Sequence, residues 1–178
     1  NDTDKWIDTL SSMRVLPMGP LSIAETRVVL AASLHLIPWF RLWRGIQLPI
    51  FQVLGEPDSG KSYFANFWRG MLTGRPSLDQ ITKEPRDFYS MIVNAPALLV
   101  LDNLNNVPRE VRGIVNDTIA KLVTDPDPHI DNRLLFKDIN QIGRWRVDCT
   151  FALTAISMPF TTNDLVQRSL IMHMQAIP

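Results

Sequence analysis

The sequence has little of several features that would narrow its class. Cys149 is the single cysteine among 178 residues, so no disulfide can form within the chain. Lysine and arginine together number 18, as do aspartate and glutamate, which leaves a formal net charge of +0. A neutral chain has no general electrostatic attraction to nucleic acid or to a membrane surface, so any basic surface must be local.

Long hydrophobic runs are also missing. The longest, at residues 28–40, is too short to span a bilayer, and it contains His35 and Pro38. We expect this run to be a buried helix that ends at the proline. No secretion signal led by lysine or arginine is present, so we expect a cytoplasmic protein with no membrane partner. Because the chain begins with Asn1 rather than methionine, we expect it to be a piece of a longer protein.

Metal-ligating residue types are equally sparse. The histidines show no metal-ligand spacing with the cysteine; they are His35, His129 and His173. The aspartate-rich stretch at 124–132 has two prolines and no glycine, which makes it a poor match to a calcium-binding loop. We expect it to be a rigid loop.

What the chain does have is the composition and patterning of one globular domain. Apolar residues make up 46% and charged residues 20% of the sequence. Strands and helices are expected to alternate, which predicts a parallel sheet covered on both faces. The expected helices are 22–37, with Ser22 and Glu25 at capping-box spacing, 61–74 and 108–123; the expected strands are 45–55, 96–106, 147–157 and 168–175.

The strongest motif is GEPDSGKS at residues 55–62, which matches G-x-x-x-x-G-K-[ST] and which we call the phosphate loop. A strand is expected to end at Gly55 and a helix to begin at Lys61, so the loop amides would converge on an anion at a helix N-terminus. Lys61 would reach the β- and γ-phosphates of a nucleotide, and Ser62 would hold Mg²⁺. The alternative is a glycine-rich turn capped by Ser62. The expected nucleotide-binding residues are Gly55, Glu56, Pro57, Asp58, Ser59, Gly60, Lys61 and Ser62.

A second acidic position supports the first motif. Asp102 follows the apolar run ALLVL, at the tip of an expected parallel strand. Ligands of such sheets bind outside the carboxyl ends of the strands, so Asp102 would contact the Mg²⁺ held by Ser62. The alternative is an Asp-Asn pair that starts a turn after a core strand.

This succession of elements resembles the AAA+ group of P-loop ATPases over about residues 46–175. The resemblance runs through the phosphate loop, a helix, an aspartate-tipped strand, a helix, a third strand, and an arginine before a fourth strand. Its closest form is that of helicase- and primase-associated ATPases of phages and mobile elements, which resemble superfamily 3 helicases. It implies an α/β fold, a P-loop NTPase three-layer sandwich with a mainly parallel central sheet at 46–178, preceded by an N-terminal helical extension at 1–45.

The resemblance also implies cofactors, roles and partners. ATP and Mg²⁺ would be bound, and Thr154, with Ser157 as second choice, would sense the γ-phosphate at the end of the third strand. Arg168 would act on the γ-phosphate of a neighbouring subunit, which implies a homo-oligomeric ring, a hexamer in the full-length protein. The alternatives are a strand hydroxyl bonded to backbone for Thr154 and a surface ion pair with Asp164 for Arg168.

One position departs from the family pattern. AAA+ ATPases usually follow the strand aspartate with a glutamate that polarises water, and here that position is Asn103. An amide orients water but cannot accept its proton, so we expect slow hydrolysis. Glu56 and Glu110 are possible substitutes, and their spacing selects neither.

Two functions therefore stay open at the level of sequence. The first is an ATP-hydrolysing motor of a DNA helicase or replication protein. The second is a nucleotide-gated signalling or defence scaffold that hydrolyses little. A nucleoside or nucleotide kinase would need an arginine-rich lid, and none is evident in the sequence.

A locally basic segment lies at residues 133–148, before the third strand. The resemblance implies a β-hairpin there that enters the central channel of a ring. Lys137, Arg144 and Arg146 would contact phosphates of single-stranded or forked DNA, and Trp145 would stack on a base or pack in the core. The alternative is an ordinary solvated loop.

Overall fold

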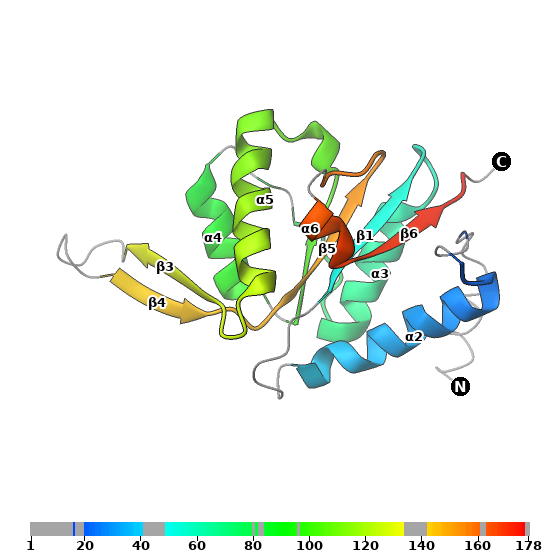
Figure 1. Ribbon diagram of the computed structural model, residues 1–178, viewed down its shortest axis with the longest axis horizontal. Helices are drawn as coiled ribbons and strands as arrows, with labels where there is room; N and C mark the ends of the chain where they lie inside the picture. Colours follow the sequence, from blue (N-terminus) through cyan, green and yellow to red (C-terminus); the bar gives the residue numbers. More distant parts are fainter. Residues whose placement is uncertain are drawn as a thin grey trace.

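The computed structural model describes residues 16, 20–40, 49–79, 81, 84–95, 97–133, 142–160 and 163–176. Its centre is a four-stranded sheet in the order β2-β5-β1-β6, in which every pairing is parallel. The strands are β1 (Ile50–Gly55), β2 (Leu98–Leu101), β5 (Thr150–Ala155) and β6 (Ser169–Met174). The strand before the phosphate loop, β1, therefore lies inside the sheet between β5 and β6 (Figure 1).

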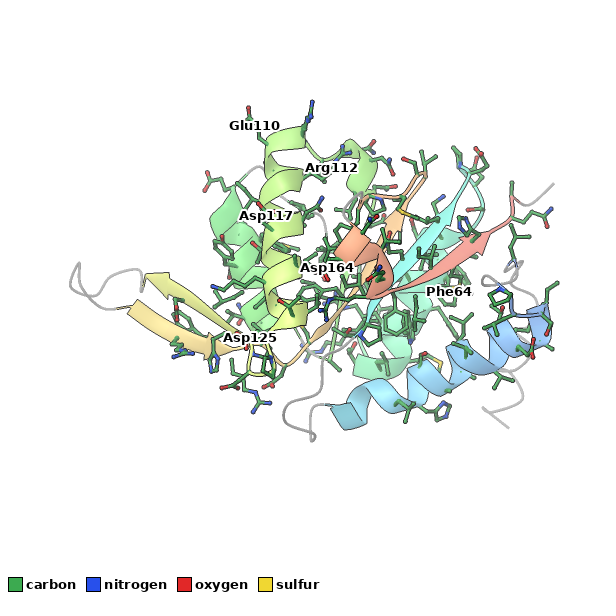
Figure 2. All side chains as sticks on the ribbon, viewed as in Figure 1. Phe64, Glu110, Arg112, Asp117, Asp125 and Asp164 are labelled. Carbon is green, nitrogen blue, oxygen red and sulfur yellow. The ribbon has the colours of Figure 1, made fainter. Side chains whose placement is uncertain are left out.

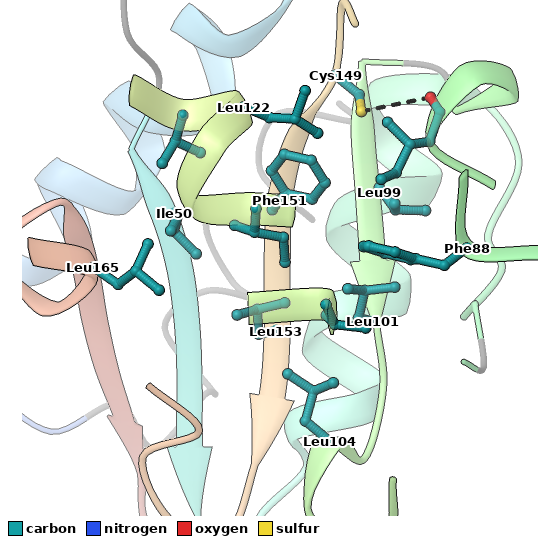
Figure 3. Close-up of a cluster of buried hydrophobic side chains, with 14 of the residues drawn as sticks. Ile50, Phe88, Leu99, Leu101, Leu104, Leu122, Cys149, Phe151, Leu153 and Leu165 are labelled. Atoms are coloured by element: carbon teal, nitrogen blue, oxygen red, sulfur yellow. Dashed lines mark hydrogen bonds between the residues drawn. The ribbon is translucent and has the colours of Figure 1, made fainter. Parts of the chain in front are cut away.

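Helices cover both faces of this sheet. On one face lie α2 (Ile23–Phe40) and α3 (Lys61–Thr73); on the other lie α4 (Pro85–Asn94), α5 (Arg109–Thr124) and the short α6 (Asn163–Gln167). Successive side chains of a strand point to opposite faces, so the sheet contributes to two separate cores. The first contains Leu30, Phe51, Phe64 and Trp68; the second, shown in Figure 3, contains Ile50, Phe88, Leu99, Phe151 and Leu165. The predicted three-layer α/β sandwich is confirmed.

The ends of the helices follow local chemistry. The predicted capping box is present, because the Ser22 amide donates to Glu25 Oε2 at 2.7 Å and the Glu25 amide donates to Ser22 Oγ at 3.2 Å. The hydrogen bond from the Ser22 backbone amide, with a smaller contribution from the Ser22 side chain, lowers the pKa of the Glu25 carboxyl. At its other end, α3 stops at Gly74, whose φ of 69° is left-handed and whose amide donates to the Gly70 carbonyl.

The prediction of a buried helix that ends at Pro38 is wrong in both parts. The helix α2 continues through this proline to Phe40. A proline in the last turn removes one backbone hydrogen bond but does not have to end the helix. It is also only partly buried: Leu30 lies in the core with Phe64, whereas Val28 is 67% exposed. Among the described residues, no helix is long and apolar enough to cross a membrane.

The structure differs from the sequence prediction at three further places. The strand expected at 96–106 is limited to β2, because the chain turns at Asn103, with a φ of 56°, into a 3-10 helix, η1 (Leu104–Asn106). The helix α4 was not predicted. The expected rigid loop at 124–132 gives way at His129 to β3 (His129–Arg133), which pairs antiparallel with β4 (Ile142–Arg146).

The strands β3 and β4 form a hairpin that projects from the body of the molecule beside α4 (Figure 1). Ile130 anchors the base of this hairpin in the second core. The boundary expected at residue 45 lies within 41–48, outside the described residues, so the division into an N-terminal extension at 1–45 and a core at 46–178 stays a prediction.

Candidate functional site

The candidate site lies where three parallel strands end. The register pairs Leu54 of β1 with Ala155 of β5, and Leu101 of β2 with Leu153 of β5. The phosphate loop after β1, the turn at Asp102 after β2, and the end of β5 therefore meet at one edge of the sheet. This carboxyl edge is where ligands of open parallel sheets bind.

The phosphate loop is tightly built. A Cβ on Gly55 would lie 2.4 Å from the Met174 carbonyl oxygen and 2.8 Å from Ser59 Oγ, so this position accepts only glycine without movement of the backbone. The chain takes left-handed conformations at Asp58, with a φ of 59°, and at Gly60, with a φ of 82°. The loop then enters α3, and no side chain caps the N-terminus of this helix. Its first backbone amides therefore have no hydrogen bond to a capping side chain.

Lys61 is a buried cation, with 7% of its surface exposed. Its Nζ donates to the Glu56 carbonyl at 2.5 Å and to Ser59 Oγ at 3.2 Å, and it forms no ion pair within the described part of the chain. A buried charge is costly unless an opposite charge or several hydrogen bonds compensate it. A lysine held in this way, beside free helix amides, is suited to an anionic ligand.

Asp102 connects the phosphate loop to the sheet. Its Oδ1 accepts a hydrogen bond from Ser62 Oγ at 2.8 Å and another from Thr154 Oγ1, and its Oδ2 accepts from Asn103 Nδ2 at 3.1 Å. The alternative in which Ser62 caps a glycine-rich turn is not what the structure shows, because its hydroxyl donates to Asp102 and α3 has no side-chain cap.

The pair of Ser62 and Asp102 fits Mg²⁺. A hydroxyl and a carboxylate are the hard oxygen ligands that this ion prefers, and it usually takes one or two protein ligands together with water and substrate phosphates. Within the described residues, no group of three or more histidine, cysteine, aspartate or glutamate side chains could hold a metal by itself.

Thr154 and Asn103 both lie against Asp102. Thr154 is fully buried, and its hydroxyl also accepts a hydrogen bond from the backbone N–H of Asn103 at 3.0 Å. Part of the alternative given for Thr154, a strand hydroxyl bonded to backbone, is therefore present. Its role as a γ-phosphate sensor, and that of Asn103 in orienting water, stay predictions.

A pocket of about 360 Å³ opens in front of these residues. It is lined by Pro57, Asp58, Gly60, Lys61, Ser62, Tyr63, Asn103 and Ile156. Of the two glutamates considered as substitute bases, neither lines it, and Figure 2 shows Glu110 pointing outward from the first turn of α5. The carboxylate among the lining residues is that of Asp58.

Sequence reasoning missed Asn105. Its Nδ2 donates to Ser157 Oγ at 3.0 Å, its Oδ1 accepts from the Ile156 amide at 2.7 Å, and its carbonyl accepts from Arg112. This asparagine fixes the segment after β5, including pocket residue Ile156, to η1. No local pattern marks it, because the partners of its side chain, Ile156 and Ser157, lie about fifty residues further along the chain.

Arg168 is not part of this pocket. Ile50 pairs with Ser169 at the start of β6, and Gly55 pairs with Met174 at its end, so Arg168 lies at the opposite edge of the sheet from the phosphate loop. Its Nε is 3.1 Å from Asp164 Oδ1, which is the ion pair offered as the alternative. A role in catalysis for Arg168 would require a second copy of the chain.

The basic residues of the hairpin lie beside carboxylates. Arg144 lies 4.0 Å from Asp131, and Arg146 lies 3.0 Å from Asp148. These ion pairs reduce the local positive charge that the segment 133–148 was predicted to carry. Lys137, the third predicted nucleic-acid contact, lies outside the described residues.

No family model matches the sequence, and no curated protein matches it. Among solved structures, the chain is similar to NtrX from Brucella abortus in complex with ADP, with 14% identity and a TM-score of 0.42 over 86% of this chain and 40% of that one. A second structure of NtrX from Brucella abortus shows 14% identity and a TM-score of 0.43 over 87% of this chain and 42% of that one.

The chain thus spans about two fifths of the length of the structures that it resembles. The parallel sheet, its strand order and the phosphate loop between β1 and α3 define a P-loop NTPase-like fold. The narrower resemblance to helicase- and primase-associated ATPases stays a prediction. The chemistry of the site has to be inferred from its own residues.

Proposed function

We propose that this chain binds ATP together with Mg²⁺ and hydrolyses it slowly. The observation that carries the proposal is the buried ammonium of Lys61, which has no carboxylate partner among the described residues and lies in a loop that leads into a helix N-terminus. A polyphosphate supplies the missing negative charge, and the free amides at the start of α3 supply its hydrogen bonds.

In this proposal the chain's own residues bind and orient the nucleotide. Gly55 to Ser62 surround the β- and γ-phosphates, with Lys61 turned from the Glu56 carbonyl to a phosphate oxygen. Ser62 and Asp102 would hold Mg²⁺, which neutralises negative charge on the phosphates when it is bound. Asp102, kept in place by Thr154, orients the metal shell from the side of the sheet.

Slow hydrolysis is expected from the geometry at Asn103. Its Nδ2 donates to Asp102 Oδ2 at 3.1 Å. An amide does not accept a proton from water, so Asn103 does not replace the glutamate as a base. Phosphoryl transfer depends mostly on positioning and charge stabilisation, so turnover is reduced rather than abolished.

The wider role that we propose is the motor of a DNA helicase or replication protein of a phage or mobile element. Two features support it: the β3–β4 hairpin projects from the body of the molecule, and the half-buried Arg168, which pairs with Asp164, lies at the far edge of the sheet. The ring would be homo-oligomeric, a hexamer in the full-length protein. Arg168 would contact the γ-phosphate bound by the next subunit, and Arg144, Arg146 and Lys137 would contact single-stranded or forked DNA.

The hydrogen bond from the side-chain amide of Asn103 to Asp102 favours a second function. A nucleotide-gated signalling or defence scaffold needs tight binding and little turnover. The ion pairs of Arg144 and Arg146 point in the same direction, because they leave less positive charge for DNA.

Turnover measurements distinguish these functions. We would compare ATP hydrolysis by the wild type, Lys61→Ala and Asn103→Glu, each with and without single-stranded DNA. The motor predicts wild-type turnover that DNA stimulates and that Lys61→Ala abolishes. The scaffold predicts an inert wild type that binds ATP, with activity gained by Asn103→Glu. If the wild type neither binds nor hydrolyses ATP, both proposals are wrong.

A further inference from the structure

We propose that Asp58 makes nucleotide binding depend on Mg²⁺, by repelling the phosphates of a metal-free nucleotide and so promoting release of ADP once the metal has left. This inference rests on the proposed function, since it concerns the regulation of the same site. It assigns to Asp58 a specific electrostatic role beyond that of a member of the phosphate loop.

The position of Asp58 is fixed by the loop around it. The residue is exposed, lines the pocket together with Lys61 and Ser62, and has a left-handed φ of 59°. The adjoining Ser59 is buried, and its amide donates to the Glu56 carbonyl at 3.3 Å. Asp58 is therefore an exposed residue of the pocket in which the phosphates are expected to bind.

Nothing in the described part of the chain neutralises this carboxylate. Asp58 forms no hydrogen bond and no ion pair there, and the nearby Lys61 ammonium donates to Glu56 and Ser59 oxygens instead. Nor does the shape of the loop require the negative charge, because glycine and asparagine adopt a left-handed conformation as readily as aspartate. The charge is thus available to act on a ligand.

The consequence for binding follows from Coulomb's law. A metal-free nucleoside diphosphate brings several negative charges next to an uncompensated carboxylate, and at the effective dielectric of a protein surface this repulsion is substantial. Bound Mg²⁺ cancels two of those charges and with them most of the repulsion. With Asp58, the site therefore binds metal-free nucleotide more weakly than it would with a neutral residue at this position.

The test uses Asp58→Asn, which removes the charge and tolerates the same backbone conformation. We would measure the Kd of ADP for both proteins, once with excess Mg²⁺ and once with EDTA, at low and at high salt. We expect the variant to bind metal-free ADP about three- to tenfold more tightly, with a smaller gain in Mg²⁺. The gain should shrink as salt rises, because salt screens exposed charges.

Asp117→Asn is the matched control, since it changes the net charge equally at an exposed position of α5 that does not line the pocket (Figure 2). It should leave both Kd values unchanged. The inference is overturned if Asp58→Asn binds metal-free ADP no more tightly, or if its gain is the same with and without Mg²⁺ and insensitive to salt. If neither protein binds ADP or ATP in Mg²⁺, the proposed function itself fails, which is a different result.

Discussion

At the scale of single residues, Asp102 shows how the fold maintains a charge that it has largely buried. The residue is 9% exposed, and its carboxylate accepts hydrogen bonds from Ser62, Asn103 and Thr154. Charged hydrogen bonds of this kind compensate the cost of desolvation. In the proposed nucleotide complex, Ser62 exchanges its bond to Asp102 for a bond to Mg²⁺, so the carboxylate needs the metal as its replacement partner.

We predict that Asp102→Asn loses the effect of Mg²⁺ on ATP binding. An amide is a weak ligand for Mg²⁺, and its NH₂ group meets donors instead of acceptors, which should also lower the free energy of unfolding by about 1–3 kcal/mol. Titration of ATP with and without Mg²⁺ measures the first effect, and urea unfolding measures the second. Asp164→Asn, which alters an exposed carboxylate far from the pocket, is the control. A variant that keeps the full Mg²⁺ dependence would exclude Asp102 from the metal site.

Residue roles were predictable from sequence only where they are local. The spacing of Gly55, Lys61 and Ser62 is a contiguous pattern, and Asp102 directly follows an apolar run. The contact between Thr154 and Asp102, by contrast, depends on the register of β2 against β5, which the sequence does not encode locally. The bridge made by Asn105 depends on the same register, and no sequence signal indicated it.

At the scale of helices and strands, chemistry at the termini was predictable and lengths were less so. The capping box at Ser22 and the stop at Gly74 both follow from side-chain or backbone chemistry within four residues. The end of α2 was misplaced because a proline near the last turn removes one backbone hydrogen bond without ending the helix. The helix α4 was missed although its apolar residues recur at helical spacing: Phe88 and Ile92 are buried, and Tyr89, Met91 and Val93 pack against the same core.

The junction of β1 and α3 gives a prediction at this scale. We expect Gly55→Ala to lower the free energy of unfolding by about 1–3 kcal/mol and to abolish nucleotide binding, because its Cβ would clash with the Met174 carbonyl and with Ser59 Oγ. Thermal or urea unfolding together with ATP binding measures both effects.

Gly113→Ala is the matched control for that change. Gly113 lies in α5, and a Cβ there would meet nothing within 4 Å. The same substitution should therefore raise the free energy of unfolding by about 0.5–1 kcal/mol and leave binding intact. Equal effects of the two substitutions would contradict the tight geometry inferred for the phosphate loop.

At the scale of the whole molecule, two cores hold three strand ends together. Because β1, β2 and β5 are buried almost throughout, their ends have little freedom to move, and the pocket at those ends is largely preformed. The alternation of apolar segments was enough to predict the layers and the parallel sheet. Contacts with other molecules, such as a second copy at Arg168 or DNA at the hairpin, also depend on the surfaces of those molecules.

The most direct test of the proposed site is the equilibrium binding of ATP to the wild type and to Lys61→Ala, measured by calorimetry with Mg²⁺ and again with EDTA. We predict that the wild type binds ATP, that Mg²⁺ tightens this binding, and that Lys61→Ala, while still folded by circular dichroism, loses at least about tenfold in affinity because the buried ammonium is gone. Equal ATP affinity of the two proteins, or affinity that Mg²⁺ does not change, would contradict a nucleotide site at the phosphate loop.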